Sequence, residues 1–192
     1  ARAESFKALY DGDVSLDLGK LALAKPAVEL PKSSFSAGFG GIDAQNFSLG
    51  WKGKTEALRL GARSLALAAP EIHAGSFFGK AGRLSGNTVK VGWNGKQDTV
   101  TFDGGKVRAE NTDLTAGNFK STITDSNAAK LAVDWNGKKE LLGVTSQTTG
   151  LAGLDFKVDP VTGGSTAVNA QALSLSVATR EDGGVSVKAA DV

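Results

Sequence analysis

The chain has 192 residues, no cysteine, and a net charge of +2 from 22 basic and 20 acidic side chains. The lack of cysteine excludes disulfides and thiolate chemistry, and the balanced charge argues against a nucleic-acid surface, which shows as clustered Lys and Arg. No apolar run reaches the roughly 18 residues of a membrane-spanning helix, and no signal-peptide pattern opens the sequence. Because the chain starts at Ala1 and contains no methionine, we expect a fragment or a processed product.

A repeat of 42 residues organises the sequence. Tryptophan occurs at 51, 93 and 135, and phenylalanine follows the same spacing at 35, 77 and 119. Such self-similarity indicates a repeat array. We therefore divide the chain into one array with units at about 9–50, 51–92, 93–134 and 135–176, and a partial unit at 177–192. Leu9 and Val177 stand in the Trp position of the first and last units.

Alternation of apolar and polar residues predicts the strands in chain order. It is clearest over residues 14–18, 47–51, 64–67 and 173–177. Turn residues separate these runs, namely the Trp-x-Gly-Lys segments, Ala69-Pro70, the stretch 103–106 and Asp182-Gly183-Gly184. We expect four or five short strands a unit, paired as antiparallel meanders because the connections are too short for helical crossovers. If the strands of a four-stranded unit lay side by side, the unit would advance the array by about 19 Å.

The apolar face of such a sheet needs a second layer against it. The sequence predicts an all-β fold in which the sheet curls into an elongated groove. A β-helix and a β-propeller are the alternatives. The unit length suits propeller blades, but the sequence lacks a Gly-His…Trp-Asp signature, and only Asn94 and Asn136 repeat as a β-helix ladder would.

The unit resembles the repetitive β regions of the bacterial AsmA-like superfamily, including its domain-of-unknown-function branch. The resemblance covers most of the chain as a pattern, and it rests on the segments Gly50-Trp51-Lys52-Gly53-Lys54, Asp134-Trp135-Asn136-Gly137-Lys138 and Ser64-Leu65-Ala66-Leu67-Ala68-Ala69-Pro70. The Ala-Pro element appears once, and Asn111-Thr112 stands in its place in the next unit.

This resemblance implies a periplasmic protein whose full-length form is anchored at the inner membrane. Its repeated sheets would curl into a long hydrophobic groove that carries phospholipid between membranes or supports outer-membrane assembly. The implied partners are phospholipid and envelope proteins at either end of the full-length chain. The lipid, the transport direction and the number of repeats do not follow from the sequence.

The aliphatic columns supply the candidate residues of the groove, as lining of an open groove or as closed core. These lipid-groove candidates are Leu16, Leu18, Leu58, Leu60, Val100, Phe102, Leu142 and Val144. The tryptophans are candidates for the groove rim or for packing between repeats, and we favour packing of each Trp-x-Gly turn on the next unit. Lys54, Lys96 and Lys138 form a line of turn lysines that we expect to be solvated.

No enzymatic activity is expected. His73 is the only histidine, so neither a metal site nor a Ser-His-acid constellation is predicted, and no cofactor is expected. The acidic residues of Asp11/Asp13, Asp98/Asp103 and Glu181/Asp182 fall in predicted turns, where they are ordinary. A passive structural or adhesin-like β-repeat module with a closed core is the alternative function, and a propeller that binds partners at one end is a third.

Overall fold

Strands make up almost all of the described chain. The computed structural model describes residues 12–29, 34–158 and 161–178, and the backbone of the strand at Val185–Ala190. Within those residues the only helical element is a 3-10 turn, η1, at Gly53–Thr55. The strands are β1 (Val14–Ala24), β2 (Ala27–Glu29), β3 (Phe35–Gly38), β4 (Gly41–Lys52), β5 (Ala57–Ala68), β6 (Glu71–Ala74), β7 (Phe77–Lys80), β8 (Arg83–Asn94), β9 (Thr99–Ala116), β10 (Phe119–Asn136), β11 (Leu141–Val158), β12 (Val161–Ala178) and β13 (Val185–Ala190).

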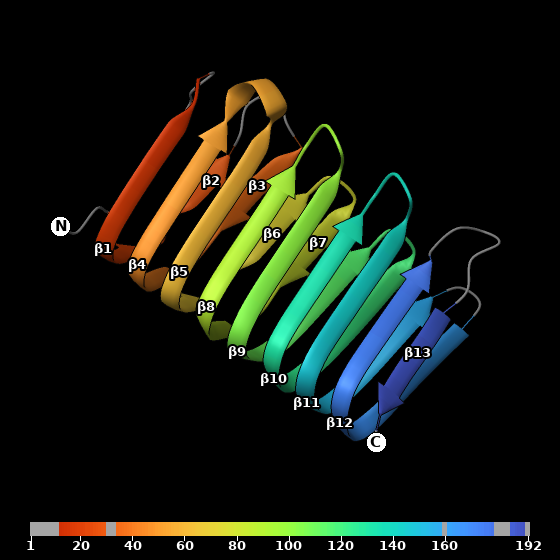
Figure 1. Cartoon of the computed structure of the whole chain (residues 1–192). Coiled ribbons are helices and arrows are strands. Elements are labelled where there is room, and N and C mark those ends of the chain that lie inside the picture. Colours follow the sequence, from red (N-terminus) through yellow and green to blue (C-terminus); the bar gives the residue numbers. More distant parts are fainter. Residues whose placement is uncertain (1–11, 30–33, 159–160, 179–184, 191–192) are drawn as a thin grey trace.

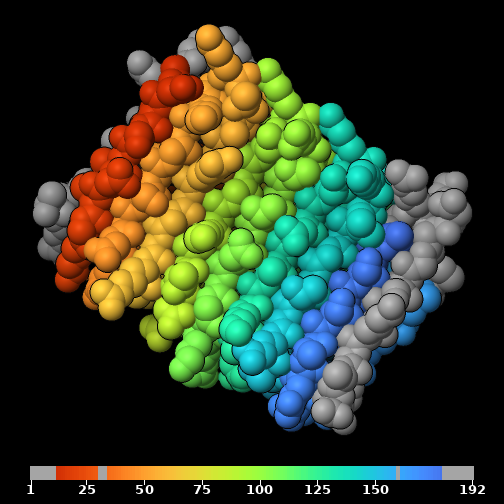
Figure 2. All heavy atoms as spheres, in the orientation of Figure 1, coloured from red at the N-terminus to blue at the C-terminus, as the bar shows by residue number. Residues whose placement is uncertain are grey.

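All thirteen strands belong to one sheet, and its long path runs β1-β4-β5-β8-β9-β10-β11-β12-β13. The short strands β2, β3, β6 and β7 pair in a second path that joins the C-terminal part of β9. In Figure 1 the long strands form a front layer, and the short strands lie behind it. The bands of Figure 2 run from red to blue across the front layer, so spatial order follows chain order.

The back layer continues the front strands around a sharp corner. The corner divides β1 from β2 at Lys25-Pro26 and β5 from β6 at Ala69-Pro70. Proline has no N–H to donate to the ladder, and the residue before it has a positive φ in both places, 49° at Lys25 and 42° at Ala69. The corner keeps its backbone pairing, because the Ala69 N–H donates to the Gly82 carbonyl at 2.9 Å.

Later strands pass through the corner without a break. β9 to β12 each contain 18 residues. In β9 and β11 the corner falls at Asn111 and Gly153, which have φ of 50° and 59°. Neither position precedes a proline, so the ladder continues on both sides of the bend.

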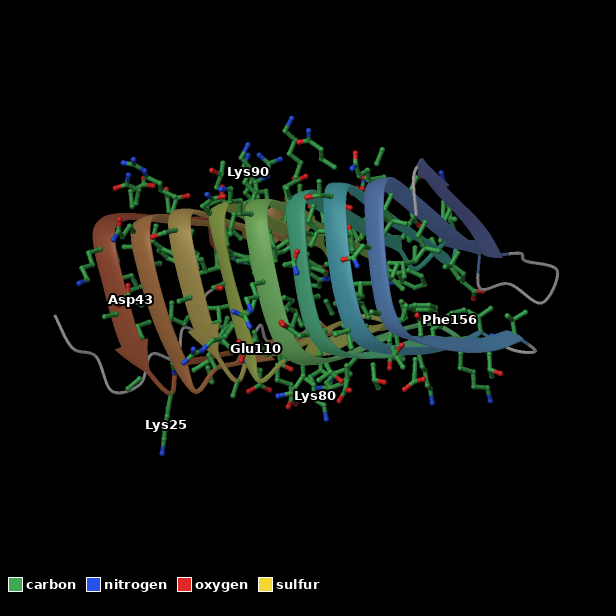
Figure 3. The ribbon with its side chains drawn as sticks, turned by 90° about the horizontal axis from the view of Figure 1, so that it is seen from below. Lys25, Asp43, Lys80, Lys90, Glu110 and Phe156 are labelled. Atoms are coloured by element: carbon green, nitrogen blue, oxygen red, sulfur yellow. The ribbon has the colours of Figure 1, made fainter. Side chains whose placement is uncertain are left out.

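A second bend crosses the front layer in β4, β8, β10 and β12. Its residues share a φ near 50° and a spacing of 42, and they are Asn46, Thr88, Lys130 and Ala172. Residues other than glycine seldom adopt this conformation. The two bends together curl the sheet into a half-barrel, seen from below in Figure 3.

The pairing register corrects the repeat alignment in the first unit. Trp51 pairs with Val14 on one side and with Leu58 on the other. Val14, and not Leu16, is therefore the equivalent of Leu58, which follows it by 44 residues. The columns that grouped Leu16 with Leu58 and Leu18 with Leu60 were wrong by two residues, because hydrogen-bond register decides equivalence. Leu9 lies outside the described residues.

The predicted all-β curled groove is confirmed, with one continuous antiparallel sheet in place of β-helix rungs or separate blades. The predicted number of four strands a unit is right for β1–β4 and β5–β8, although only β2, β3, β6 and β7 are short. It is wrong for the next two units, which hold two long bent strands each. The four strands of each of the first two units stack in two layers, with the two long strands in front of the two short ones (Figure 1). A unit therefore advances the array by two strand spacings, about 10 Å, and not by the expected 19 Å.

Candidate functional site

The interior of the half-barrel is the candidate site, and the ladder rows show which residues face it. Directly opposed residues in an antiparallel sheet point to the same face. Each row is therefore assigned a face by its buried members. Figure 3 shows Phe156 between the two layers, whereas Lys90 and Lys80 point away from them on opposite sides.

The tryptophans form a row along the front rim, at the ends of β4, β8 and β10. Trp51, Trp93 and Trp135 are only 9%, 4% and 1% exposed. The rings of Trp51 and Trp93 are stacked, with centroids 6.2 Å apart and an interplanar angle of 10°. Leu58 and Val100 lie between successive tryptophans in the same row. The indoles thus pack from unit to unit and do not stand free at the rim.

A second row of apolar residues runs along the back rim, where β3 and β7 begin, and meets the tryptophan row. The rings of Phe35 and Trp93 lie 5.0 Å apart. We call the resulting cluster the rim seam. Its buried members are Phe35, Ala37, Trp51, Ala74, Trp93, Val100, Ala116, Phe119, Trp135, Leu142, Val158 and Val177.

Polar contacts also cross the mouth of the half-barrel at Ser76. Ser76 lies in the β6–β7 turn of the back rim, and Asp98 lies in the β8–β9 turn of the front rim. The Ser76 hydroxyl donates to Asp98 Oδ2 at 3.3 Å and accepts from Trp135 Nε1 at 3.2 Å. The rims are thus joined by side chains, since no strand pairing in the described residues crosses the mouth.

Within each rim, backbone hydrogen bonds tie neighbouring turns together. On the front rim, the Gly95 N–H donates to the Glu56 carbonyl at 2.9 Å, and the Gly137 N–H donates to the Asp98 carbonyl at 2.8 Å. On the back rim, the Gly75 N–H donates to the Ser34 carbonyl at 3.0 Å. Each rim is therefore a continuous ladder of turns.

Phenylalanine, leucine and valine side chains, with two alanines, fill the N-terminal half of the interior near the bends. The buried members of this second cluster, the bend cluster, are Ala44, Phe47, Ala62, Leu65, Leu67 and Val89. Leu18, Leu60 and Phe102 are partly buried and pack against it.

Smaller residues replace these in the C-terminal half. The inward row that contains Leu65 continues as Gly86, Val107, Ala128, Thr149 and Ala170. Around these small residues lie partly exposed aliphatic residues that belong to neither cluster. We call this set the C-terminal lining: Ile123, Leu131, Leu151, Leu154, Val168 and Leu173.

Polar groups in the interior are few and uncharged. Ser121, Ser146 and Thr149 are 5%, 6% and 8% exposed, and the Ser146 and Thr149 hydroxyls hydrogen-bond to each other. The Thr112 hydroxyl is buried without a partner, which is a costly arrangement. No charged residue occupies the inward rows of the described residues. The inner wall is therefore apolar with isolated hydroxyl groups.

Two open hollows, of about 430 and 420 Å³, lie over the bends of β9 to β12. Their walls combine exposed polar residues such as Asn127 and Thr148 with inward residues such as Ala128 and Thr149. Neither hollow has the enclosed apolar lining of a small-molecule pocket.

The lipid-groove candidates all lie in inward rows of the front wall. Val100 and Leu142 are buried in the rim seam, and Leu58 and Val144 pack against it. Leu18, Leu60 and Phe102 pack against the bend cluster, whereas Leu16 on β1 is 40% exposed.

The C-terminal lining and Ser76 were missed as candidate residues. A signal for part of the lining was present, because Leu131 and Leu173 share the 42-residue column of Phe47 and Val89. Ser76 follows Ser34 by the same 42 residues, but only the curl of the sheet brings it to the tryptophan row.

The remaining polar residues singled out in the sequence lie on the outer surface. The His73 side chain is 51% exposed and hydrogen-bonds to Glu71 Oε1 at 3.1 Å. Lys54, Lys96 and Lys138 are exposed on the front-rim turns, where the Lys96 ammonium donates to the Lys54 carbonyl. No group of three or more His, Asp or Glu in the described residues is placed to hold a metal ion.

Asp11 and Glu181-Asp182 lie outside the described residues. The part of the chain that the structure describes has no helix with the length and hydrophobicity needed to cross a membrane.

Comparison of the chain with protein-family models, curated proteins and solved structures gives no match. The function is therefore inferred from the geometry and chemistry of the interior, together with the sequence resemblance.

Proposed function

We propose that this chain is a segment of a periplasmic β-groove protein that shields or conducts lipid acyl chains. The observation that carries the proposal is the C-terminal lining. These inward aliphatic residues stay partly exposed inside a half-barrel whose inward rows carry no charged residue in the part of the chain that the structure describes. A folded protein ordinarily closes such positions with larger neighbours. Small residues at Ala128, Thr149 and Ala170 instead leave the lining accessible.

Transfer free energies are consistent with this role. Removing an acyl chain from water contributes about 0.8 kcal/mol per methylene, or roughly 13 kcal/mol for a chain of about 16 carbons. The long path of the sheet has nine strands, which at about 4.8 Å a strand gives a trough roughly 38 Å long. An uncharged interior also avoids placing unpaired charges against hydrocarbon.

The cellular setting comes from the AsmA-like resemblance. We place the full-length protein in the periplasm, anchored at the inner membrane, with phospholipid as ligand and envelope proteins at its ends. It would conduct acyl chains between membranes or support outer-membrane assembly. The direction of lipid transport would be set by those envelope proteins.

The second candidate is a structural or adhesin-like β-repeat module with a closed core. The rim seam favours it, since Trp93 and Trp135 are almost fully buried and the rims touch. In that case the apolar rows would serve packing alone, and no lipid would enter.

Native mass spectrometry and organic extraction separate the two candidates. The protein is produced in a lipid-containing host, as wild type and as Leu173→Asp and Ser174→Asp variants. These neighbours on β12 are a matched pair, because Leu173 faces inward and Ser174 is exposed outside. We expect phospholipid with the wild type and Ser174→Asp, and little with a folded Leu173→Asp. No lipid on the wild type, even after incubation with vesicles, would favour the closed module.

A further inference from the structure

A polar fastening at Ser76 joins the two rims of the half-barrel in addition to the aromatic seam. Ser76 comes from the back rim, while Asp98 and Trp135 come from the front rim. The Ser76 hydroxyl joins the two rims because it donates to the carboxylate and accepts from the indole N–H. The indole-to-hydroxyl distance of 3.2 Å lies at the upper end of the ordinary N–H···O range, and the hydroxyl-to-carboxylate distance of 3.3 Å exceeds the ordinary O–H···O range, so both hydrogen bonds are weak.

Two glycines make room for the carboxylate between the rims. A Cβ at Gly75 of the back rim would lie 2.1 Å from Asp98 Oδ1, and a Cβ at Gly137 of the front rim would lie 1.7 Å from Asp98 Oδ2. Any side chain at either position would displace Asp98. The carboxylate thus sits in a space that both rims leave for it.

The fastening differs from the equivalent positions of the neighbouring units. One unit earlier the corresponding residues are Ser34, Glu56 and Trp93, and one unit later they are Asn118, Glu140 and Val177. Glu56 Oε2 lies within 2.8 Å of the Cβ position of Gly95, on its own rim. The Val177 side chain has no hydrogen-bond donor. The full set of serine, aspartate and tryptophan therefore occurs once.

We propose that Ser76, Asp98 and Trp135 form a latch that holds the rims together and whose release admits an acyl chain through the mouth. The inference rests on the proposed function and adds how the interior is reached. The burial of apolar surface in the seam is non-directional, whereas the hydrogen bonds at Ser76 are directional and favour one relative position of the two rims. Ser76 itself is exposed, so water competes for its bonds and the latch is reversible.

A reversible cross-link tests lateral entry. The native chain has no cysteine, so Ser76→Cys with Asp98→Cys gives one defined pair across the mouth. The control is Thr145→Cys with Ser174→Cys, which are directly paired on the outer face of β11 and β12. Uptake is measured from phosphatidylethanolamine–phosphatidylglycerol vesicles that contain a pyrene-labelled phospholipid, before and after oxidation.

We expect oxidation of the rim pair to slow lipid uptake at least tenfold, reduction to restore it, and the control pair to show no change. Equal uptake by the oxidised and reduced rim pair would overturn the latch, since lipid would then enter from the ends of the trough.

A readout without lipid separates failure of the latch from failure of the proposed function. Spin labels at Lys120→Cys and Lys138→Cys report the distance between back-layer and front-rim positions that are both exposed. Adding Ser76→Ala is expected to broaden that distance distribution. An unchanged distribution refutes the latch. A broadened distribution in a protein that takes up no lipid would show that the rims are fastened as described, while refuting both lipid entry and the proposed function.

Discussion

Replacing two tryptophans by phenylalanine would measure what the indole N–H contributes at the mouth. Trp135 and Trp51 occupy the same row and are both buried, at 1% and 9% exposure. They differ in one respect, because Trp135 Nε1 donates to Ser76 whereas Trp51 Nε1 is buried with no partner. Trp135→Phe and Trp51→Phe therefore remove similar volume and different polar interactions.

The expected costs follow from that difference. Each change leaves a cavity of roughly 40 Å³, which costs about 1 kcal/mol. Trp135→Phe also loses a hydrogen bond worth about 1 kcal/mol, whereas Trp51→Phe removes an unsatisfied buried donor that costs about 1–3 kcal/mol. The free energy of unfolding should fall by about 2 kcal/mol for Trp135→Phe, whereas for Trp51→Phe it should stay unchanged or rise by up to about 2 kcal/mol.

Urea unfolding followed by far-ultraviolet circular dichroism gives both values without relying on tryptophan emission. The comparison holds if the m-value is the same in all proteins. Ser76→Ala provides the control, because combining it with Trp135→Phe should cost less than the sum of the two single changes. Equal costs for the two tryptophans, or additive costs in the double variant, would refute the role assigned to the Ser76 contact.

Three further predictions concern packing, backbone and charge. Gly104→Ala should lower the free energy of unfolding, measured in urea, by about 1–3 kcal/mol, because the added Cβ would lie 2.2 Å from Val107. A Cβ added at Gly50 would meet nothing within 4 Å, so Gly50→Ala should cost less. Thr88 has a φ of 51°, and Thr88→Asn should raise the unfolding midpoint because asparagine tolerates this conformation better; a lower midpoint would contradict that. The hydrogen bond to Asp113, followed by its charge, raises the pKa of Lys80 above 10.5, so this stabilisation is complete below 10.5 and is lost as pH rises through the higher folded value. NMR titration of the ammonium should show that pKa falling in an Asp113→Asn variant, and an unchanged pKa would rule out the pairing.

Much of the fold follows from the sequence because a half-buried strand has a period of two. The alternation from Phe47 to Trp51 and the 42-residue spacing together predict a repeated antiparallel sheet. The positions of the bends do not follow from this alternation or from the spacing. Asn46, Thr88, Lys130 and Ala172 share a positive φ but no side-chain chemistry, so no residue type marks the place.

The two-residue offset of the first unit was hidden for a similar reason. Leu16 and Leu18 continue the apolar alternation that begins at Val14. Either alignment therefore places apolar residues in apolar columns. Only the pairing of Val14 with Trp51 decides between them.

The candidate site was predicted in part. The inward front wall, with Val100 and Leu142, follows from the 42-residue repeat and from the alternation of apolar and polar residues along each strand. The rim seam and the latch do not, because Trp135 and Ser76 are 59 residues apart and meet only when both bends curl the sheet. The C-terminal lining depends on small neighbours in adjacent strands, which a single-strand pattern does not reveal.

Photo-cross-linking inside the trough tests the central claim most directly. A photoreactive phenylalanine analogue is placed at Leu131, which faces the interior, or at Ala132, which lies in an outward row with Asp103 and Thr145. Each protein is irradiated in cells and analysed by intact mass. The account predicts a phospholipid adduct at position 131 and none at position 132. No adduct at 131, or equal adducts at both positions, would contradict an interior that holds acyl chains.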